Sequence, residues 1–305
     1  VTFVVLLLLP IQALGKDPAS AERLKKADRK LQAKIDHAIR KGTIWLLSQQ
    51  ERDGSFPHPY TPGFVEAGGT ALSLLALLHC DVKPEDRRVR RGFDFLRKHH
   101  ARHKVDPPGR YSGLKVYVTS VMILALAQYG TEREKGDEGP GRGTVRLDES
   151  DLRWAREMTD WLVSVQAPNG GWGYPVPGRT DASNSQYAIL ALKEARRLRI
   201  RVPRQVFEKA LAWWLSSQEK DGPKVQRHEE TGGDGVFTAE RTVAPVWDRA
   251  RGWGYIGSGT PTGSMTTAGV AAMALLRTEL GNSRQRLAAE QAMYDGLAWL
   301  GHHFS

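Results

Sequence analysis

The chain has 305 residues, of which 40% are hydrophobic and 26% are charged; this composition fits a globular protein and excludes wholesale disorder. The formal net charge is +10, but the basic residues are spread along the chain without a recognition motif, so we expect no nucleic-acid partner. A single cysteine, Cys80, excludes an internal disulfide and an all-cysteine metal site.

The chain begins with an apolar run, residues 1–15, about as long as the core of a signal peptide and too short to span a bilayer. Ala13 and Gly15 are small residues suited to cleavage after Gly15. We therefore expect a signal peptide over 1–15, a lead-in segment over 16–34, and an extracytoplasmic mature protein, periplasmic or secreted, without an integral membrane span. A buried N-terminal strand is the alternative.

Two kinds of helix are expected to alternate from residue 35 onward. Four segments align without gaps, each opening with Thr or Ser and carrying Ala at the seventh position: 70–77, 119–126, 185–192 and 266–273. Because they are apolar on all sides, they predict buried helices, with the hydroxyl residue as N-cap. Amphipathic, charged helices are expected around them at 35–50, 88–100, 153–166, 206–218 and 288–304.

Three of the amphipathic helices end with the same motif, in which Trp is followed by Gln and then by Gly. Its copies are Trp45, Gln50 and Gly54; Trp161, Gln166 and Gly170; and Trp213, Gln218 and Gly222. The glycine is expected to end the helix in a left-handed turn, and the Gln amide to bond the freed carbonyls. In the third copy, residues 223–251 form an insertion, and Gly252–Tyr255 looks like the displaced end of the motif. Residues 131–150 are charged and glycine-rich, and are expected to be a second, solvated loop.

This alternation predicts an all-α fold, an α/α toroid of two concentric helix rings over residues 35–305, with a straight solenoid as the alternative. We expect the toroid to be incomplete at its C-terminus, with at least one inner helix missing. The Trp–Gln–Gly ending resembles the QW repeat of squalene–hopene cyclases and other terpenoid cyclases, whose toroid is shared with protein prenyltransferase β-subunits. The resemblance implies the toroid fold and an isoprenoid-handling protein.

The motifs for catalysis in that superfamily are absent from this sequence. The nearest match to the Asp-x-Asp-Asp acid of the cyclases is Asp148–Asp151, which stands where a helix cap is expected. His79, Cys80 and Asp81 are consecutive, so on a helix they cannot all face one metal ion. We therefore expect no metal site and no cofactor.

If the inner helices run parallel, the loops that precede them meet at one pole, where helix N-termini favour anions and aromatic side chains can line a ligand pocket. The candidate catalytic residues there are Asp181, Glu66 and His58. The candidate ligand-binding residues are Tyr60, Tyr111, Tyr117, Trp172, Tyr174, Asn184, Gln186, Trp253 and Tyr255. For Asp181, a role as helix cap or turn residue is the alternative.

The sequence thus predicts an exported prenyltransferase/squalene-cyclase-like repeat protein that binds a small-molecule, lipid or glycan ligand at this pole. Two alternatives stay open: a carbohydrate-active α/α-barrel enzyme and a non-catalytic binding or scaffold domain. Whether the protein is an enzyme is left open, because function depends on the site and not on the fold.

Overall fold

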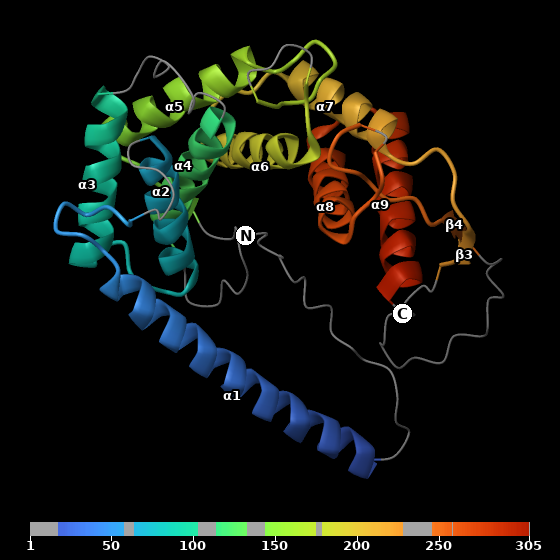
Figure 1. The fold of residues 1–305 in the computed structure, drawn as a ribbon, viewed down its shortest axis with the longest axis horizontal. Coiled ribbons are helices and arrows are strands. Elements are labelled where there is room, and N and C mark those ends of the chain that lie inside the picture. Colours follow the sequence, from blue (N-terminus) through green and yellow to red (C-terminus); the bar gives the residue numbers. More distant parts are fainter. Residues whose placement is uncertain are drawn as a thin grey trace. The chain divides into compact units, whose positions relative to one another are not determined.

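A computed structural model describes residues 18–57, 64–102, 114–132, 144–174, 179–227, 246–257 and 259–304, and these residues are mostly helical (Figure 1). This confirms the predicted all-α class. The helices of the described part are α1 (Pro18–Ser48), α2 (Phe64–His79), α3 (Arg87–Arg102), α4 (Lys115–Tyr129), α5 (Glu149–Ser164), α6 (Ala182–Arg197), α7 (Arg204–Ser217), α8 (Gly263–Glu279) and α9 (Ser283–Phe304). Each of the nine overlaps one expected helix; the two-ring arrangement stays a prediction.

The chain divides into two compact units. Unit 1 comprises Val1–Tyr111 and Leu124–Leu147, and unit 2 comprises Ser112–Ile123 and Asp148–Ser305. In unit 1, α2 packs against α3; in unit 2, α8 packs against α6, α7 and α9, and Figure 1 shows α8 beside α9.

The ends of both expected loops carry short antiparallel strand pairs that the sequence analysis did not predict. β1 (Thr131–Glu132) pairs with β2 (Thr144–Val145), and β3 (Lys224–Gln226) pairs with β4 (Trp247–Arg249). Near the N-terminus, α1 begins at Pro18. The expected lead-in segment, residues 16–34, is therefore helical from Pro18 onward and continuous with the first amphipathic helix. The predicted signal peptide, residues 1–15, lies outside the described residues.

The apolar helices supply much of the buried core. Ala125, Ala191 and Ala272, three of the four alanines shared by the aligned segments, are at most 1% exposed. Small side chains at these positions let neighbouring helices approach closely. The amphipathic helices bury one face; α5, for example, buries Trp154 and Leu162 and begins at the N-cap Asp148, whose carboxylate accepts from the backbone N–H of Asp151 (2.8 Å). The cap predicted for Asp148 is therefore confirmed.

The hydroxyl residues that open the aligned segments are not N-caps, so that prediction was wrong. The caps of α6 and α8 are Asp181 and Thr262. The hydroxyls instead lie inside the helices, where three of the four, Thr70, Ser185 and Thr266, accept a hydrogen bond from the backbone N–H of the returning aromatic residue. The pairs are Phe56 with Thr70 (3.0 Å), Trp172 with Ser185 (2.9 Å) and Trp253 with Thr266 (3.1 Å). A buried N–H without a partner is costly, and the hydroxyl satisfies it.

The three motif glutamines make the same pair of bonds, which we call the glutamine link. Each Nε2 group donates to the carbonyl that closes the following turn and to a carbonyl of the next amphipathic helix. Gln50 bonds Gly54 (3.0 Å) and Arg88 (2.8 Å), Gln166 bonds Gly170 (2.9 Å) and Val206 (2.9 Å), and Gln218 bonds Arg251 (3.0 Å) and Ala292 (3.0 Å). The expected acceptors, the last carbonyls of the helix that ends, are therefore corrected: the acceptors lie in the turn and in the next amphipathic helix, so the link joins consecutive amphipathic helices.

The third motif copy is closed across its insertion. The backbone N–H of Glu219 donates to the carbonyl of Gly252 (3.0 Å), whereas the matching bond of the second copy joins Ala167 and Gly171 (3.0 Å), only four positions apart. Trp253 Nε1 donates to the Trp214 carbonyl (2.9 Å), as Trp172 Nε1 donates to the Leu162 carbonyl (2.8 Å). Gly252–Tyr255 is therefore the displaced end of the motif, as predicted.

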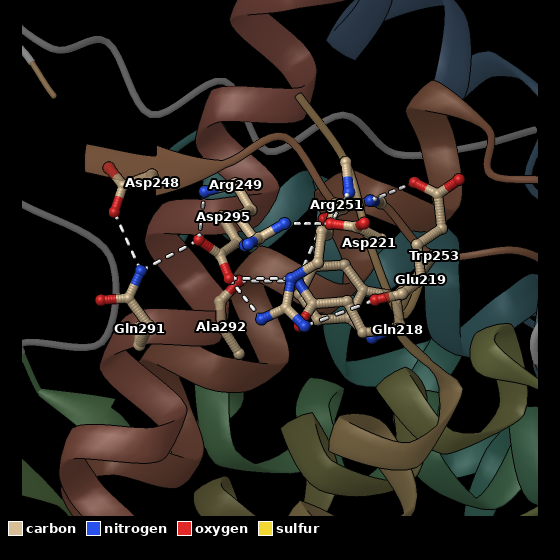
Figure 2. Close-up of polar contacts among 12 residues, drawn as sticks. Gln218, Glu219, Asp221, Asp248, Arg249, Arg251, Trp253, Gln291, Ala292 and Asp295 are labelled. Atoms are coloured by element: carbon tan, nitrogen blue, oxygen red, sulfur yellow. Dashed lines mark hydrogen bonds and ion pairs between the residues drawn. The ribbon is translucent and has the colours of Figure 1, made fainter. Parts of the chain in front are cut away.

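A buried carboxylate fixes the returning end of this insertion (Figure 2). Asp295, 2% exposed, accepts hydrogen bonds from Arg249 N (2.9 Å), Gln291 Nε2 (2.9 Å) and Arg251 Nε (3.0 Å). Gln291 also donates to Asp248 (2.9 Å), as Figure 2 shows. Burial favours the neutral form of Asp248, but hydrogen bonds from Arg227 and Gln291 outweigh it and hold its pKa below the usual range. Because these charges are paired, the network stabilises the insertion and leaves no free catalytic carboxylate.

Candidate functional site

Three predicted ligand-binding residues meet at the start of α6. Tyr174 and Tyr255 end two equivalent Trp-Gly-Tyr segments, and their hydroxyl oxygens are 3.3 Å apart. Ser183 Oγ is hydrogen-bonded to the hydroxyl of Tyr117 and lies 3.4 Å from that of Tyr255. We call Tyr117, Tyr174, Tyr255 and Ser183 the tyrosine cluster.

Backbone bonds gather the elements that carry this cluster. Asp181 N donates to the Trp172 carbonyl (2.9 Å), Ala182 N donates to the Tyr255 carbonyl (2.9 Å), and Thr262 N donates to the Trp253 carbonyl (3.1 Å). These bonds join the N-terminal ends of α6 and α8. The C-terminal ends of the two helices are also in contact.

At those C-terminal ends, Glu279 of α8 pairs with Lys193 and Arg196 of α6. The two helices therefore run parallel, and the contact of Tyr117 with Ser183 brings the start of α4 to the same side. The starts of these three helices therefore lie together within unit 2, and the pole of a complete ring stays a prediction.

Asp181 is the N-cap of α6. Its carboxylate, 2% exposed, accepts from Asn184 N (2.8 Å), Asn184 Nδ2 (2.8 Å) and Ser183 Oγ (3.1 Å). All three contacts use the carboxylate as an acceptor, as a helix cap requires. The structure thus supports the alternative role, a cap that orients Ser183, and gives Asp181 no contact suited to donating a proton.

Two phenols of the cluster, Tyr117 and Tyr174, are held in their neutral form. Burial, together with the hydrogen bond in which the Tyr174 hydroxyl donates to that of Tyr255, raises the pKa of Tyr174 to about 12. Burial also raises the pKa of Tyr117 and that of Tyr187, whose ring lies 5.2 Å from the Tyr117 ring in an edge-on arrangement. At neutral pH these hydroxyls keep their protons, so they can donate hydrogen bonds beside an aromatic wall.

Two other predicted ligand contacts are core residues. Trp172 and Trp253 are 1% and 0% exposed, and both indole N–H groups are used on backbone carbonyls. Their prediction as ligand-facing residues is therefore corrected: they position the tyrosines that follow them in the chain. Asn184 is fully buried, with its Nδ2 on Asp181 and its Oδ1 without a hydrogen bond, and Gln186 is half-buried on the next part of α6.

The remaining candidates lie outside what the structure describes. These are His58, Tyr60 and Tyr111, together with the side chain of Glu66, whose backbone belongs to α2. Their proposed roles stay predictions.

A cleft of about 320 Å³ adjoins the cluster in sequence, and the sequence analysis did not predict it. It is lined by Asn169, Arg179, Thr180, Trp213, Ser216, Ser217, Ile256 and Gly257. Asn169 Nδ2 and Trp213 Nε1 both donate to Thr180 Oγ1 (3.0 and 2.9 Å), which fixes the floor of the cleft. One feature of the sequence could have indicated this cleft. Asn169 occupies the position before the motif glycine, where the other two copies have Asp53 and Asp221.

Among the described residues, no group of three or more His, Cys, Asp and Glu side chains could hold a metal ion. None of the described helices is both long enough and apolar enough to span a bilayer. Searches against family models, curated proteins and solved structures gave no match.

Proposed function

We propose that this protein is an exported repeat protein of the prenyltransferase/squalene-cyclase type that binds a ligand at the tyrosine cluster. The observation that carries the proposal is the convergence of three tyrosine hydroxyls from three separate segments: those of Tyr117 and Tyr255 meet Ser183, and that of Tyr174 meets Tyr255. Tyr255 is 41% exposed, so the cluster is open to solvent.

The chemistry of the cluster favours an uncharged ligand with an oxygen acceptor on an apolar or flat body. Neutral phenols donate to such an oxygen, and their rings provide an apolar wall. Among the described residues in contact with the cluster, Asp181 is the only carboxylate, and it caps α6. A glycoside hydrolase of the common type needs two carboxylates across the scissile bond, so the proposal is one of binding and assigns no reaction.

The test measures binding of a polyprenyl alcohol, a polyprenyl diphosphate and a maltooligosaccharide by calorimetry. We expect the polyprenyl alcohol to bind, and the double variant Tyr174→Phe/Tyr255→Phe to weaken that binding about 30-fold, the loss of two ordinary hydrogen bonds. Tyr294→Phe, in α9, is the matched control and should bind like the parent. Unchanged binding in the double variant, or binding of none of the three probes, would refute the proposal.

A further inference from the structure

The helix α1 exposes a stripe of large apolar side chains. Leu31, Ile35 and Ile39 follow one another at four-residue spacing, and Trp45 falls within the same stripe, so all four share one helix face. Leu31 is 57% exposed, Ile39 45% and Trp45 63%. Scattered apolar residues are normal on a surface, but a continuous row on one helix marks a contact surface.

A row of lysines follows one edge of this stripe. Lys30 and Lys34 are four residues apart, and Lys41 comes seven residues later, so the three lie along one line on the helix. All three are exposed. Over residues 29–48, α1 carries five basic side chains and one acidic side chain, Asp36, whose carboxylate accepts from Gln32 Nε2 (2.8 Å). The apolar stripe is thus bordered by excess positive charge.

We propose that α1 lies on an anionic phospholipid surface, with its apolar stripe in the interface and its lysines on the lipid headgroups. An amphipathic helix with this pattern partitions into the boundary between headgroups and acyl chains, a depth that suits Trp45. Each basic residue near such a surface adds to binding through the negative potential of the leaflet.

The charge of the chain disfavours a second copy as the occupant. Two α1 stripes packed together would bring two lysine rows close, in a chain whose net charge is +10. An anionic bilayer offers the opposite charge and an apolar layer at once. The proposal concerns unit 1 and does not depend on ligand binding at the tyrosine cluster.

The test is co-sedimentation of the full chain with vesicles. One set is phosphatidylcholine alone, and the other contains roughly a third phosphatidylserine. We expect binding to the anionic vesicles, little binding to the neutral ones, and a fall in binding as salt screens the lysines. Residues 1–15 are present in the parent and in every variant, so their contribution cancels when a variant is compared with the parent on the same vesicles.

Two variants and two matched controls locate the surface. Lys34→Gln/Lys41→Gln should weaken binding about 30-fold, and Leu31→Gln/Ile39→Gln should weaken it at least tenfold through lost apolar burial. The controls are Lys220→Gln/Lys224→Gln, which removes two exposed lysines of unit 2, and Leu287→Gln/Phe304→Gln, which removes two apolar side chains that are 64% and 72% exposed. Both controls should bind like the parent. Circular dichroism should be unchanged throughout, because every substituted side chain is exposed.

Three results would overturn the proposal. The first is equal binding to neutral and anionic vesicles, and the second is loss of binding in the controls equal to that in the α1 variants. The third is a parent protein that ignores vesicles but forms a dimer which Leu31→Gln/Ile39→Gln dissociates, since the occupant would then be a second copy.

Discussion

The first and third copies of the Trp–Gln–Gly motif have the same internal bonds but different surroundings. Ser48 Oγ donates to the Trp45 carbonyl (2.6 Å) and Ser216 Oγ to the Trp213 carbonyl (2.8 Å), and both copies form the glutamine link. Yet Trp45 is 63% exposed, whereas Trp213 is 5% exposed. Trp213 is covered because its Nε1 bonds Thr180, in the segment that precedes α6.

In the second copy, the burial of the motif tryptophan lies between that of Trp45 and that of Trp213. Trp161 is half-buried. The Lys115 ammonium nitrogen lies over its ring, 4.5 Å from the ring centroid. Across the three copies the bonds to backbone carbonyls stay constant, while the cover over the tryptophan changes. Each copy therefore makes the same backbone closure, locally in the first two and across the insertion in the third, and burial of the tryptophan is supplied by a neighbouring segment.

The largest expected loss of stability comes from substituting the motif glycines. This loss should be the same in the first and second copies of the motif. Gly54 and Gly170 have φ of 98° and 95°, and an added Cβ would lie 2.2 Å from the Arg91 carbonyl oxygen and 2.1 Å from that of Lys209. Gly54→Ala and Gly170→Ala should each lower the free energy of unfolding by about 3–4 kcal/mol, from left-handed strain plus the clash.

Gly42→Ala, within α1, is the control for the glycine variants. A Cβ there meets nothing within 4 Å, so this change should raise stability by about 0.5–1 kcal/mol. Urea denaturation of the three variants checks these values. A tolerated Gly54→Ala would show that the first copy does not need its turn.

An intermediate loss of stability is expected from substituting the motif glutamines. This loss should be larger in the third copy than in the first. Gln218 is 4% exposed, so Gln218→Leu leaves two carbonyls without their donor and should cost about 2 kcal/mol. Gln50 is half-buried, and its bond to Arg88 is exposed, so water can replace the donor and Gln50→Leu should cost less than about 1 kcal/mol. Thermal unfolding of both variants tests the order, and equal losses would contradict it.

The smallest effect should come from the tryptophans. Trp213→Phe removes the indole donor to Thr180, which keeps its bond from Asn169 (3.0 Å), so a loss of about 1 kcal/mol is expected. Trp45→Phe should change stability by less than about 0.5 kcal/mol, because its side chain is mostly exposed. A larger loss for Trp45→Phe than for Trp213→Phe would show that α1 is covered in solution.

The helices could be predicted, because their periodicity depends on short spacings within the sequence, and all nine described helices overlap an expected one. The glutamine links could be predicted only in part: the amide was expected to bond carbonyls near its own helix end, whereas one acceptor of each link lies in another helix, 38, 40 or 74 positions away. The roles of Thr70, Ser185 and Thr266 were misread, because a hydroxyl before an apolar run looks like a cap, and its true partner is an N–H 13 or 14 residues earlier.

The candidate site was only partly predictable. Tyr174 and Tyr255 repeat the Trp-Gly-Tyr pattern, so their meeting followed from the repeat, but the placement of Ser183 between hydroxyls did not. Spacing also cannot tell that Trp172 faces inward while Tyr174, two residues on, does not, because this depends on the backbone bond between Trp172 and Asp181. The bonds around Asp295 join residues 44 and 46 positions apart, beyond any local pattern.

The closure of the third copy gives this chain a natural place for engineering. Glu219 and Gly252 are joined by the bond that elsewhere spans four positions, and Asp295 anchors the strand that leads back. Since loop length adds little entropy once both ends are held, the stretch between the paired strands β3 and β4 can be shortened, replaced or used to display a foreign peptide while Asp248, Arg249 and Arg251 keep their contacts with α9.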